Sequence, residues 1–238
     1  MPVCAGTMEA WLPRGRWAVA QGIHTFGCQV GAAIAPPVLV VLIAQLHWQP
    51  ALIWVSLPPL ALIALWFWYG RDTPSEHRSV TSGELAELDS TPQSQPDGNI
   101  SLGRIAAILR NRSILILTVS YVLMNYVFYL LANWSFLYLI QERHFTVLEG
   151  GLLASLPPIG AALGAFVGGV VTDAMSLRFG ATWGFRLMPL IALPSAGALL
   201  LVATYSSNAY AAVIALTGAY LAVELNEASY WAGTMRIG

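Results

Sequence analysis

Long stretches without a charged side chain constrain this chain more than any other feature. A helix that crosses a bilayer needs about 20 mostly apolar residues, and five uncharged runs in the sequence are that long. The last run, residues 187–223, is long enough for two helices, and the polar turn sequence at residues 205–208 divides it. The sequence therefore predicts an all-α integral membrane protein with six spanning helices. These are expected at residues 18–46, 50–70, 113–140, 150–172, 187–205 and 209–231.

The composition excludes several classes of protein. Of the 238 residues, 57% are hydrophobic and 10% are charged, whereas soluble domains have about 25% charged residues. The net charge of -1 provides no basic field for a nucleic-acid partner. All basic residues are arginine, so no lysine is present for a phosphate loop or a Schiff base. The lipid bilayer is the expected environment, and no nucleic acid is expected to bind.

Enzymatic and metal chemistry are not expected either. The two cysteines, Cys4 and Cys28, are too few for a disulfide framework or a zinc cluster. The four histidines are scattered, and neither a His-Glu-x-x-His nor a Gly-x-Ser-x-Gly run occurs. Most tryptophans lie near the ends of expected helices, where they are typical anchors at the lipid headgroups. We therefore expect no enzyme, no metal and no cofactor.

The arginines predict the orientation in the membrane. Cytoplasmic loops are enriched in Lys and Arg, and with both termini inside, ten of the eleven arginines fall in cytoplasmic segments. Arg143 alone falls in an outer loop. The first residues lack a short apolar core followed by a cleavage site, so no cleaved signal peptide is expected. The sequence predicts a multi-pass inner-membrane protein with both termini in the cytoplasm.

A polar segment, residues 71–112, separates two groups of helices. It holds nearly half of the chain's 23 charged residues. Residues 91–99 are rich in Pro, Ser, Gln and Gly, which is typical of a flexible linker. Leu102, Ile105, Ile108 and Leu109 recur at helical spacing, which indicates an interfacial helix. The expected parts are 1–70 with two helices, the cytoplasmic linker 71–112, and 113–238 with four helices.

One loop carries a recognisable motif. Gly169, Asp173, Arg178 and Gly180 follow the order Gly, three residues, Asp, then Arg and Gly, which resembles the loop signature of the major facilitator superfamily after its eighth helix. Residues 11–22 resemble the turn before the fifth family helix, and the charged segment resembles the central linker. The resemblance extends over nearly the entire chain. Within the superfamily, these stretches are similar to the anion:cation symporter branch, whose members take up organic acids.

This resemblance implies that the chain corresponds to family helices five to ten. Transporters of the family have twelve helices, so the chain looks like a fragment, and the missing helices are candidate partners. The motif would form a cytoplasmic gate. Glycines allow close helix approach, and Asp173 can cap a neighbouring helix or pair with an arginine. The alternative is that Asp173 and Arg178 are merely solvated loop charges.

The last expected helix contains two carboxylates, Glu224 and Glu227. A charged residue at the centre of a membrane helix costs about 2.5–3.5 kcal/mol on insertion scales, so such residues need a partner or water. We expect their stripe of the helix to face a cavity and Glu224 to bind the coupling proton. The alternative is that both carboxylates only reach the cytoplasmic interface. The stripe contains Tyr220, Glu224, Glu227 and Trp231.

A second polar stripe lies on the expected helix at residues 113–140. Its residues, which recur every four positions, are Tyr121, Asn125, Tyr129 and Asn133. They can hydrogen-bond a polar solute, but such residues also hold membrane helices together, and both readings stay open. By the resemblance, both stripes line the central cavity. The predicted substrate-binding residues are Asn125, Tyr129, Asn133, Tyr220 and Glu224, and further polar candidates are His24, Thr25 and Gln29.

The sequence thus predicts transmembrane transport of a small organic solute by a permease of the major facilitator type. The solute is expected to be an organic acid, carried by a proton-coupled symporter through alternating access. The alternative is a non-transporting six-helix membrane protein with a structural or assembly role, because the chain has only half of the family's helices.

The topology is testable by cysteine labelling in a background without Cys4 and Cys28. We expect a membrane-impermeant maleimide to label Glu142→Cys in intact cells, because this position lies in an outer loop. Ser94→Cys should be labelled only after the cells are lysed. Labelling of Ser94→Cys in intact cells would contradict the predicted orientation.

Overall fold

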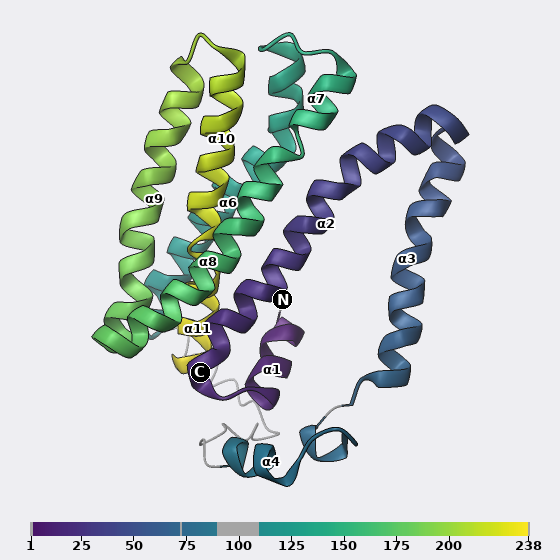
Figure 1. Cartoon of the computed structure of the whole chain (residues 1–238). Helices are drawn as coiled ribbons and strands as arrows, with labels where there is room; N and C mark the ends of the chain where they lie inside the picture. The colour runs from purple at the N-terminus through teal and green to yellow at the C-terminus, as the bar shows by residue number, and fades with distance from the viewer. Residues whose placement is uncertain (1, 72, 90–109, 238) are drawn as a thin grey trace.

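The computed structural model describes residues 2–71, 73–89 and 110–237, and all regular structure within them is helical. Six helical segments are long and apolar enough to cross a membrane, as the sequence predicted. They form a bundle with one outlying helix (Figure 1). The spanning elements are α2 (Trp17–Leu46), α3 (Trp48–Tyr69), α6 (Arg112–Gln141), α8 (Leu156–Phe179), α9 (Ala181–Tyr205), and α10 (Ala209–Glu224) together with α11 (Glu227–Ile237).

Short elements lie before the first span and between later spans. The predicted linker at residues 91–99 and the predicted interfacial helix at residues 102–109 lie outside the described residues. The segment before them contains one helix of eight residues, α4, close to the start of α2 and the end of α3 (Figure 1). The short elements are α1 (Pro2–Trp11), η1 (Arg14–Arg16), η2 (Pro74–Glu76), α4 (Ser82–Asp89) and α7 (Val147–Leu153).

The last span is broken, whereas the sequence predicted one continuous helix to about residue 231. The side-chain amide of Asn226 donates to the carbonyl oxygens of Ala222 at 3.0 Å and Val223 at 3.1 Å. The backbone amide of Asn226 also donates to Val223 O. An asparagine side chain that bonds nearby backbone groups competes with the helix, so α10 ends at Glu224 and α11 begins at Glu227. The break places both carboxylates at helix ends.

Prolines were predicted to lie inside membrane helices, and most of them do. The pair Pro157-Pro158 is an exception, because it occupies the first turn of α8. Proline is well suited to this position, where its missing amide has no helical partner in any case. The preceding helix α7 begins separately, at a capping box formed by Thr146 and Glu149. The prolines inside helices are Pro36 and Pro37, Pro58 and Pro59, Pro189, and Pro194.

Helix α8 packs against α10 without intervening side chains. A Cβ atom added to Gly160 would lie 2.5 Å from the carbonyl oxygen of Thr217. A Cβ atom on Gly164 would overlap Leu221 O, and one on Gly168 would overlap Leu225 O. Glycines at every fourth position therefore let the two backbones touch over more than two turns, which is how membrane helices gain van der Waals contact.

The same helix packs against α2 on another face. A Cβ atom on Gly169 would lie 2.6 Å from Ala18 O, and one on Gly22 would lie 2.6 Å from Ala165 O. Helix α3 is different, because it stands apart from α8 beyond α2 (Figure 1). Its side chains are mostly exposed, including Phe67 at 82%. The centre of the bundle is therefore α8, between α2 and α10.

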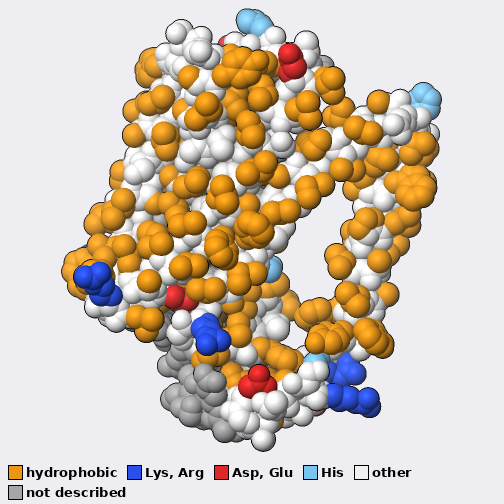
Figure 2. All heavy atoms as spheres, viewed as in Figure 1, with side chains coloured by type: hydrophobic (Ala, Val, Ile, Leu, Met, Phe, Trp, Pro, Cys, Tyr) orange, Lys and Arg blue, Asp and Glu red, His pale blue; other side chains and the backbone are white. Residues whose placement is uncertain are grey.

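The surface separates apolar from charged side chains. Apolar side chains cover the visible faces of the spans, and the arginines lie at the lower end of the view (Figure 2). We call this end, with its arginines, the arginine-rich end. Helices α2, α6 and α9 begin there, and α3 and α8 end there. Arg143 lies at the opposite end, between α6 and α7. The arginines at the arginine-rich end include Arg16, Arg71, Arg78, Arg110, Arg112, Arg178 and Arg186.

We expect Gly164→Val to lower the free energy of unfolding in detergent by about 1–3 kcal/mol, because the added atoms overlap α10. The matched control is Gly31→Val, because a Cβ atom at Gly31 in α2 meets nothing within 4 Å. Thermal unfolding of the two purified variants measures the difference. Equal midpoints would show that the contact between α8 and α10 contributes no stability.

Candidate functional site

Glu224, the last residue of α10, is held by a side chain from α2. Its Oε1 atom accepts a hydrogen bond of 2.9 Å from Gln29 Nε2. Both side chains are buried, with exposed fractions of 5% for Glu224 and 8% for Gln29. Glu224 Oε2 has no hydrogen-bond partner among the described residues. Since burial of a carboxyl group is costly without partners, this oxygen is available to a proton or a ligand.

Glu227, the first residue of α11, joins a second hydrogen-bonded group. Its Oε1 atom accepts from Trp231 Nε1 at 2.8 Å and from Tyr121 Oη at 3.0 Å. Trp231 Nε1 also lies 3.1 Å from Tyr121 Oη. Nearby, Ser120 Oγ and Tyr230 Oη lie 2.5 Å apart. These bonds fasten the start of α6 to α11.

Tyr220 connects α10 to a later part of α6. Its hydroxyl lies 3.2 Å from Ser135 Oγ, and its ring meets the Phe128 ring edge to face, with centroids 5.8 Å apart. Tyr220 is buried. Its hydroxyl therefore meets α6, while Glu224, one turn further along α10, bonds to α2.

The predicted polar stripe of α6 is only partly gathered at the carboxylates. Tyr121 joins them, as described above, although Asn125 and Asn133 donate instead to carbonyl oxygens of their own helix, those of Tyr121 and Tyr129. Tyr129 is 61% exposed. The roles of Asn125, Tyr129 and Asn133 as solute ligands stay predictions.

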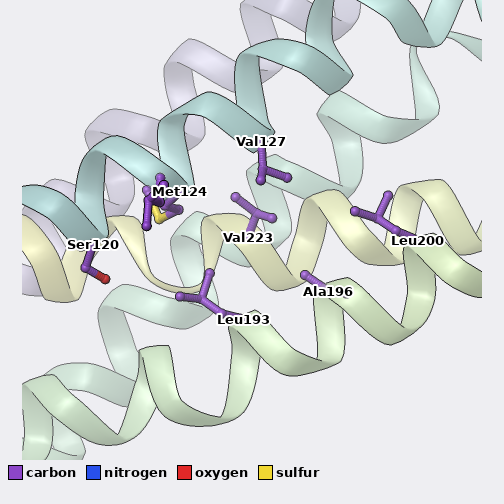
Figure 3. A pocket seen from close by; sticks show the side chains of 9 residues that line it. Ser120, Met124, Val127, Leu193, Ala196, Leu200 and Val223 are labelled. Atoms are coloured by element: carbon purple, nitrogen blue, oxygen red, sulfur yellow. The ribbon is translucent and has the colours of Figure 1, made fainter.

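A groove of about 280 Å³ lies between α6, α9 and α10 (Figure 3). Its one hydroxyl, on Ser120, already pairs with Tyr230, and neither Glu224 nor Glu227 lines it. An apolar groove with no free polar group among its lining residues cannot orient a polar solute. The labelled lining residues are Ser120, Met124, Val127, Leu193, Ala196, Leu200 and Val223.

The predicted gate residues lie at the arginine-rich end of α8. Asp173 Oδ2 accepts a hydrogen bond of 2.9 Å from the backbone amide of Val19, the third residue of α2. A carboxylate at this position is favoured by the free amides and by the dipole of the helix. Gly180 joins α8 to α9 with φ of +80°, a conformation that other residues rarely adopt. The exposed Arg178 lies over the ring of Phe179, at 5.5 Å.

The site contains Gln29, which was not among the substrate-binding residues predicted from the sequence. Gln29 was only a further candidate, yet it supplies the hydrogen bond to Glu224. The available signal was its spacing, because Gln21, Thr25 and Gln29 recur every four residues in an otherwise apolar segment.

Arg143 was not predicted to have a structural role. Its guanidinium donates to Ser206 O at 2.7 Å and to Ala203 O at 2.8 Å, at the end of α9. Its Nε donates to Tyr138 Oη at 2.7 Å. A cation at the C-terminal end of a helix satisfies carbonyl oxygens that lack helical partners. Arg143 therefore ties the turn after α6 to the end of α9.

Comparison with known proteins decides the family. The family model described as the Major Facilitator Superfamily matches residues 1–234. The chain belongs to the major facilitator superfamily. This confirms the resemblance and agrees with the six spanning helices. The motif was expected to continue into a loop after residue 172, but Gly169, Asp173 and Arg178 all lie inside α8, which continues to Phe179.

Several curated proteins that are named as transporters resemble this chain. The probable sulfoacetate transporter SauU of Cupriavidus necator is 28% identical over 97% of this chain and 53% of its own length. The hexuronate transporter of Bacillus subtilis is 23% identical over 93% and 51%. The probable galactarate/D-glucarate transporter GarP of Escherichia coli is 23% identical over 92% and 51%. The chain spans about half the length of these relatives, which are named as transporters and not as enzymes.

We expect Asp173→Ala to lower the free energy of unfolding by about 0.5–2 kcal/mol, because α2 loses the carboxylate at its first turn. Hydrogen exchange at the Val19 amide should become faster, since this amide loses its acceptor. Asp173→Asn is the matched control, because it retains an acceptor oxygen and loses only the charge. Unchanged exchange at Val19 in Asp173→Ala would contradict the capping role.

Proposed function

We propose that this chain supplies helices of an inner-membrane transporter that carries a small organic acid by alternating access. The names of the three relatives refer to sulfoacetate, hexuronate and galactarate or D-glucarate, all of which are organic acids. Such solutes are anionic at neutral pH, which agrees with the anion:cation symporter branch suggested by the sequence. The proposal places both termini in the cytoplasm and keeps the division into residues 1–70, 71–112 and 113–238.

The observation that carries the proposal is the buried carboxylate of Glu224 at the break between α10 and α11. Broken membrane helices commonly form the sites where transporters bind solutes and coupling ions. A second carboxylate, Glu227, is also buried, and no arginine is among the buried side chains that the structure describes. An anion would be repelled by two ionised carboxylates, so protonation of Glu224 favours its binding. In this way proton and acid are coupled as co-substrates.

The contacts between α2 and the later helices give the proposal its conformational step. Gln29 bonds to Glu224 near the middle of the span, and Val19 bonds to Asp173 at the arginine-rich end. Both bonds join the first expected part of the chain to the third. Rocking of one bundle against the other would break and reform them.

The proposal assigns two groups of residues to the transport cycle. The solute would contact the polar residues of α6 and α10, and the motif at the end of α8 would act as the cytoplasmic gate. Because the chain spans about half the length of its relatives, the remaining wall of the solute site would come from further helices. The solute-contacting residues are Asn125, Tyr129, Asn133, Tyr220 and Glu224, and the gate residues are Gly169, Asp173, Arg178 and Gly180.

We expect proteoliposomes that contain this chain together with the further helices that complete the solute site to accumulate at least one of sulfoacetate, D-glucuronate and D-glucarate when the pH outside is lower than inside. Glu224→Gln should abolish the accumulation, because an amide cannot carry the proton, while the amount of inserted protein stays the same. Uptake of radiolabelled acids measures the effect.

Glu149→Gln is the matched control, because Glu149 is exposed and its carboxylate accepts hydrogen bonds from Thr146 at the start of α7. It should leave uptake unchanged. Gradient-driven uptake that persists in Glu224→Gln would remove Glu224 from the mechanism. Failure of all three acids to accumulate would favour the alternative of a non-transporting membrane protein.

A further inference from the structure

A row of buried polar side chains on α2 leads from Glu224 toward the arginine-rich end. Gln29, Thr25 and Gln21 recur every four residues, with exposed fractions of 8%, 3% and 1%. At 1.5 Å of rise per residue, the row is about 12 Å long. Gln29 bonds to Glu224, and Gln21 Nε2 lies 3.4 Å from Thr25 Oγ1. Since polar side chains are costly inside a membrane protein, such a row is a candidate for function.

Polar side chains of α8 and α11 lie in the same layer of the bundle. Gly168 of α8 touches Leu225, and both helices run toward the arginine-rich end, so Thr172 and Ser229 follow one turn further along. Thr172 also lies three residues after Gly169, which touches α2. The junction of α2, α8 and α11 therefore contains hydroxyl groups on a level between Glu224 and the arginine-rich end.

These polar groups are buried but not satisfied by the protein. Thr172, Asn226 and Ser229 are at most 2% exposed. Thr172 Oγ1, Ser229 Oγ and Asn226 Oδ1 have no hydrogen-bond partner among the residues that the structure describes, and the same holds for Glu224 Oε2. Buried polar atoms of native proteins are nearly always hydrogen-bonded, either to protein or to water. Water molecules, which both donate and accept, can satisfy these four atoms.

We propose that these residues form a hydrated path along which a proton moves between Glu224 and the cytoplasm. Glu224 Oε2 releases its proton to a water molecule, which passes one of its own protons to the next, so that one proton leaves for each one that enters. The hydroxyls of Thr172 and Ser229 hold the water by accepting and donating hydrogen bonds. We call the path the polar seam, formed by Gln21, Thr25, Gln29, Thr172, Asn226 and Ser229.

The polar seam is closed at the arginine-rich end in this conformation. The side chains of Trp17, Ala18, Ala228 and Ala232 form a buried apolar cluster between α2 and α11. Water does not cross such a cluster easily. Proton exchange with the cytoplasm therefore requires α2 to move away from α11. The seam rests on the proposed function for the role of the proton, and it adds the route and the side of release.

The seam is testable without a transported solute. Proteoliposomes are selected for a tag at the N-terminus that faces the medium, so that a pH jump in the medium acts on the predicted cytoplasmic face. Infrared spectroscopy then follows the C=O band of the protonated Glu224 carboxyl, which is identified by its loss in Glu224→Gln. We expect the double variant Thr172→Val/Ser229→Ala to respond about tenfold more slowly than the unchanged chain, because water in the seam loses two hydrogen-bonding groups.

The matched control is Thr204→Val/Ser195→Ala, whose hydroxyls donate to carbonyl oxygens of their own helix α9. This control, and Thr172→Ser, should respond at the original rate. A double variant that keeps the original rate would overturn the seam, as would the absence of a band that Glu224→Gln removes. If the band responds as expected but no acid is taken up, the transport proposal fails and the seam stands.

Discussion

Close contact between the backbones of α8 and its neighbours is the interaction on which the rest of the structure depends. In a bilayer, apolar side chains gain little by leaving lipid for protein, so helices associate through van der Waals contact and hydrogen bonds. Gly164 and Gly168 provide this contact toward α10, and Gly169 and Gly22 provide it toward α2. Helix α8 thereby fixes the distance between the two helices that share the hydrogen bond from Gln29 to Glu224.

This packing also explains why polar groups are tolerated deep in the bundle. The break after Glu224 leaves backbone groups that lipid cannot satisfy, and the side chain of Asn226 takes two carbonyl oxygens. Because α8 lies directly against the break at Gly168, the freed groups face protein instead of lipid. The carboxylate of Glu224 is thus buried where close packing of the helices excludes hydrocarbon.

The sequence was sufficient for features that depend on local composition. Apolar run lengths predicted all six spans, because crossing a bilayer is a requirement on each segment by itself. The family followed from the glycines and charges around Asp173. Features that depend on a side chain competing with backbone hydrogen bonds, or on contacts between separate segments, could not be predicted from the sequence. The break at Asn226 results from a side chain that outcompetes backbone bonds, and the position of Pro157 depends on the neighbouring turn.

In the candidate site, too, single residues could be predicted from the sequence, but the contacts between helices could not. Tyr220, Glu224 and Glu227 were found because polar residues are conspicuous in an apolar helix. The partner of Glu224 comes from a helix 195 positions away in sequence, and helical periodicity does not reveal which helix lies opposite. Helical periodicity also does not reveal that the side chains of Asn125 and Asn133 donate to carbonyl oxygens of their own helix, and the roles of these residues as solute ligands stay predictions.

The guanidinium of Arg143 suggests why one arginine breaks the charge asymmetry of the chain. Its N–H groups are committed to oxygens at the end of α9 and to Tyr138, so its charge compensates the negative pole of that helix. A lysine could not serve three acceptors in one plane. Arg143, the one arginine that does not fall in a predicted cytoplasmic segment, thus connects the turn after α6 to the end of α9. Arginines counted to predict orientation are therefore best weighted by whether their hydrogen bonds give them a structural role.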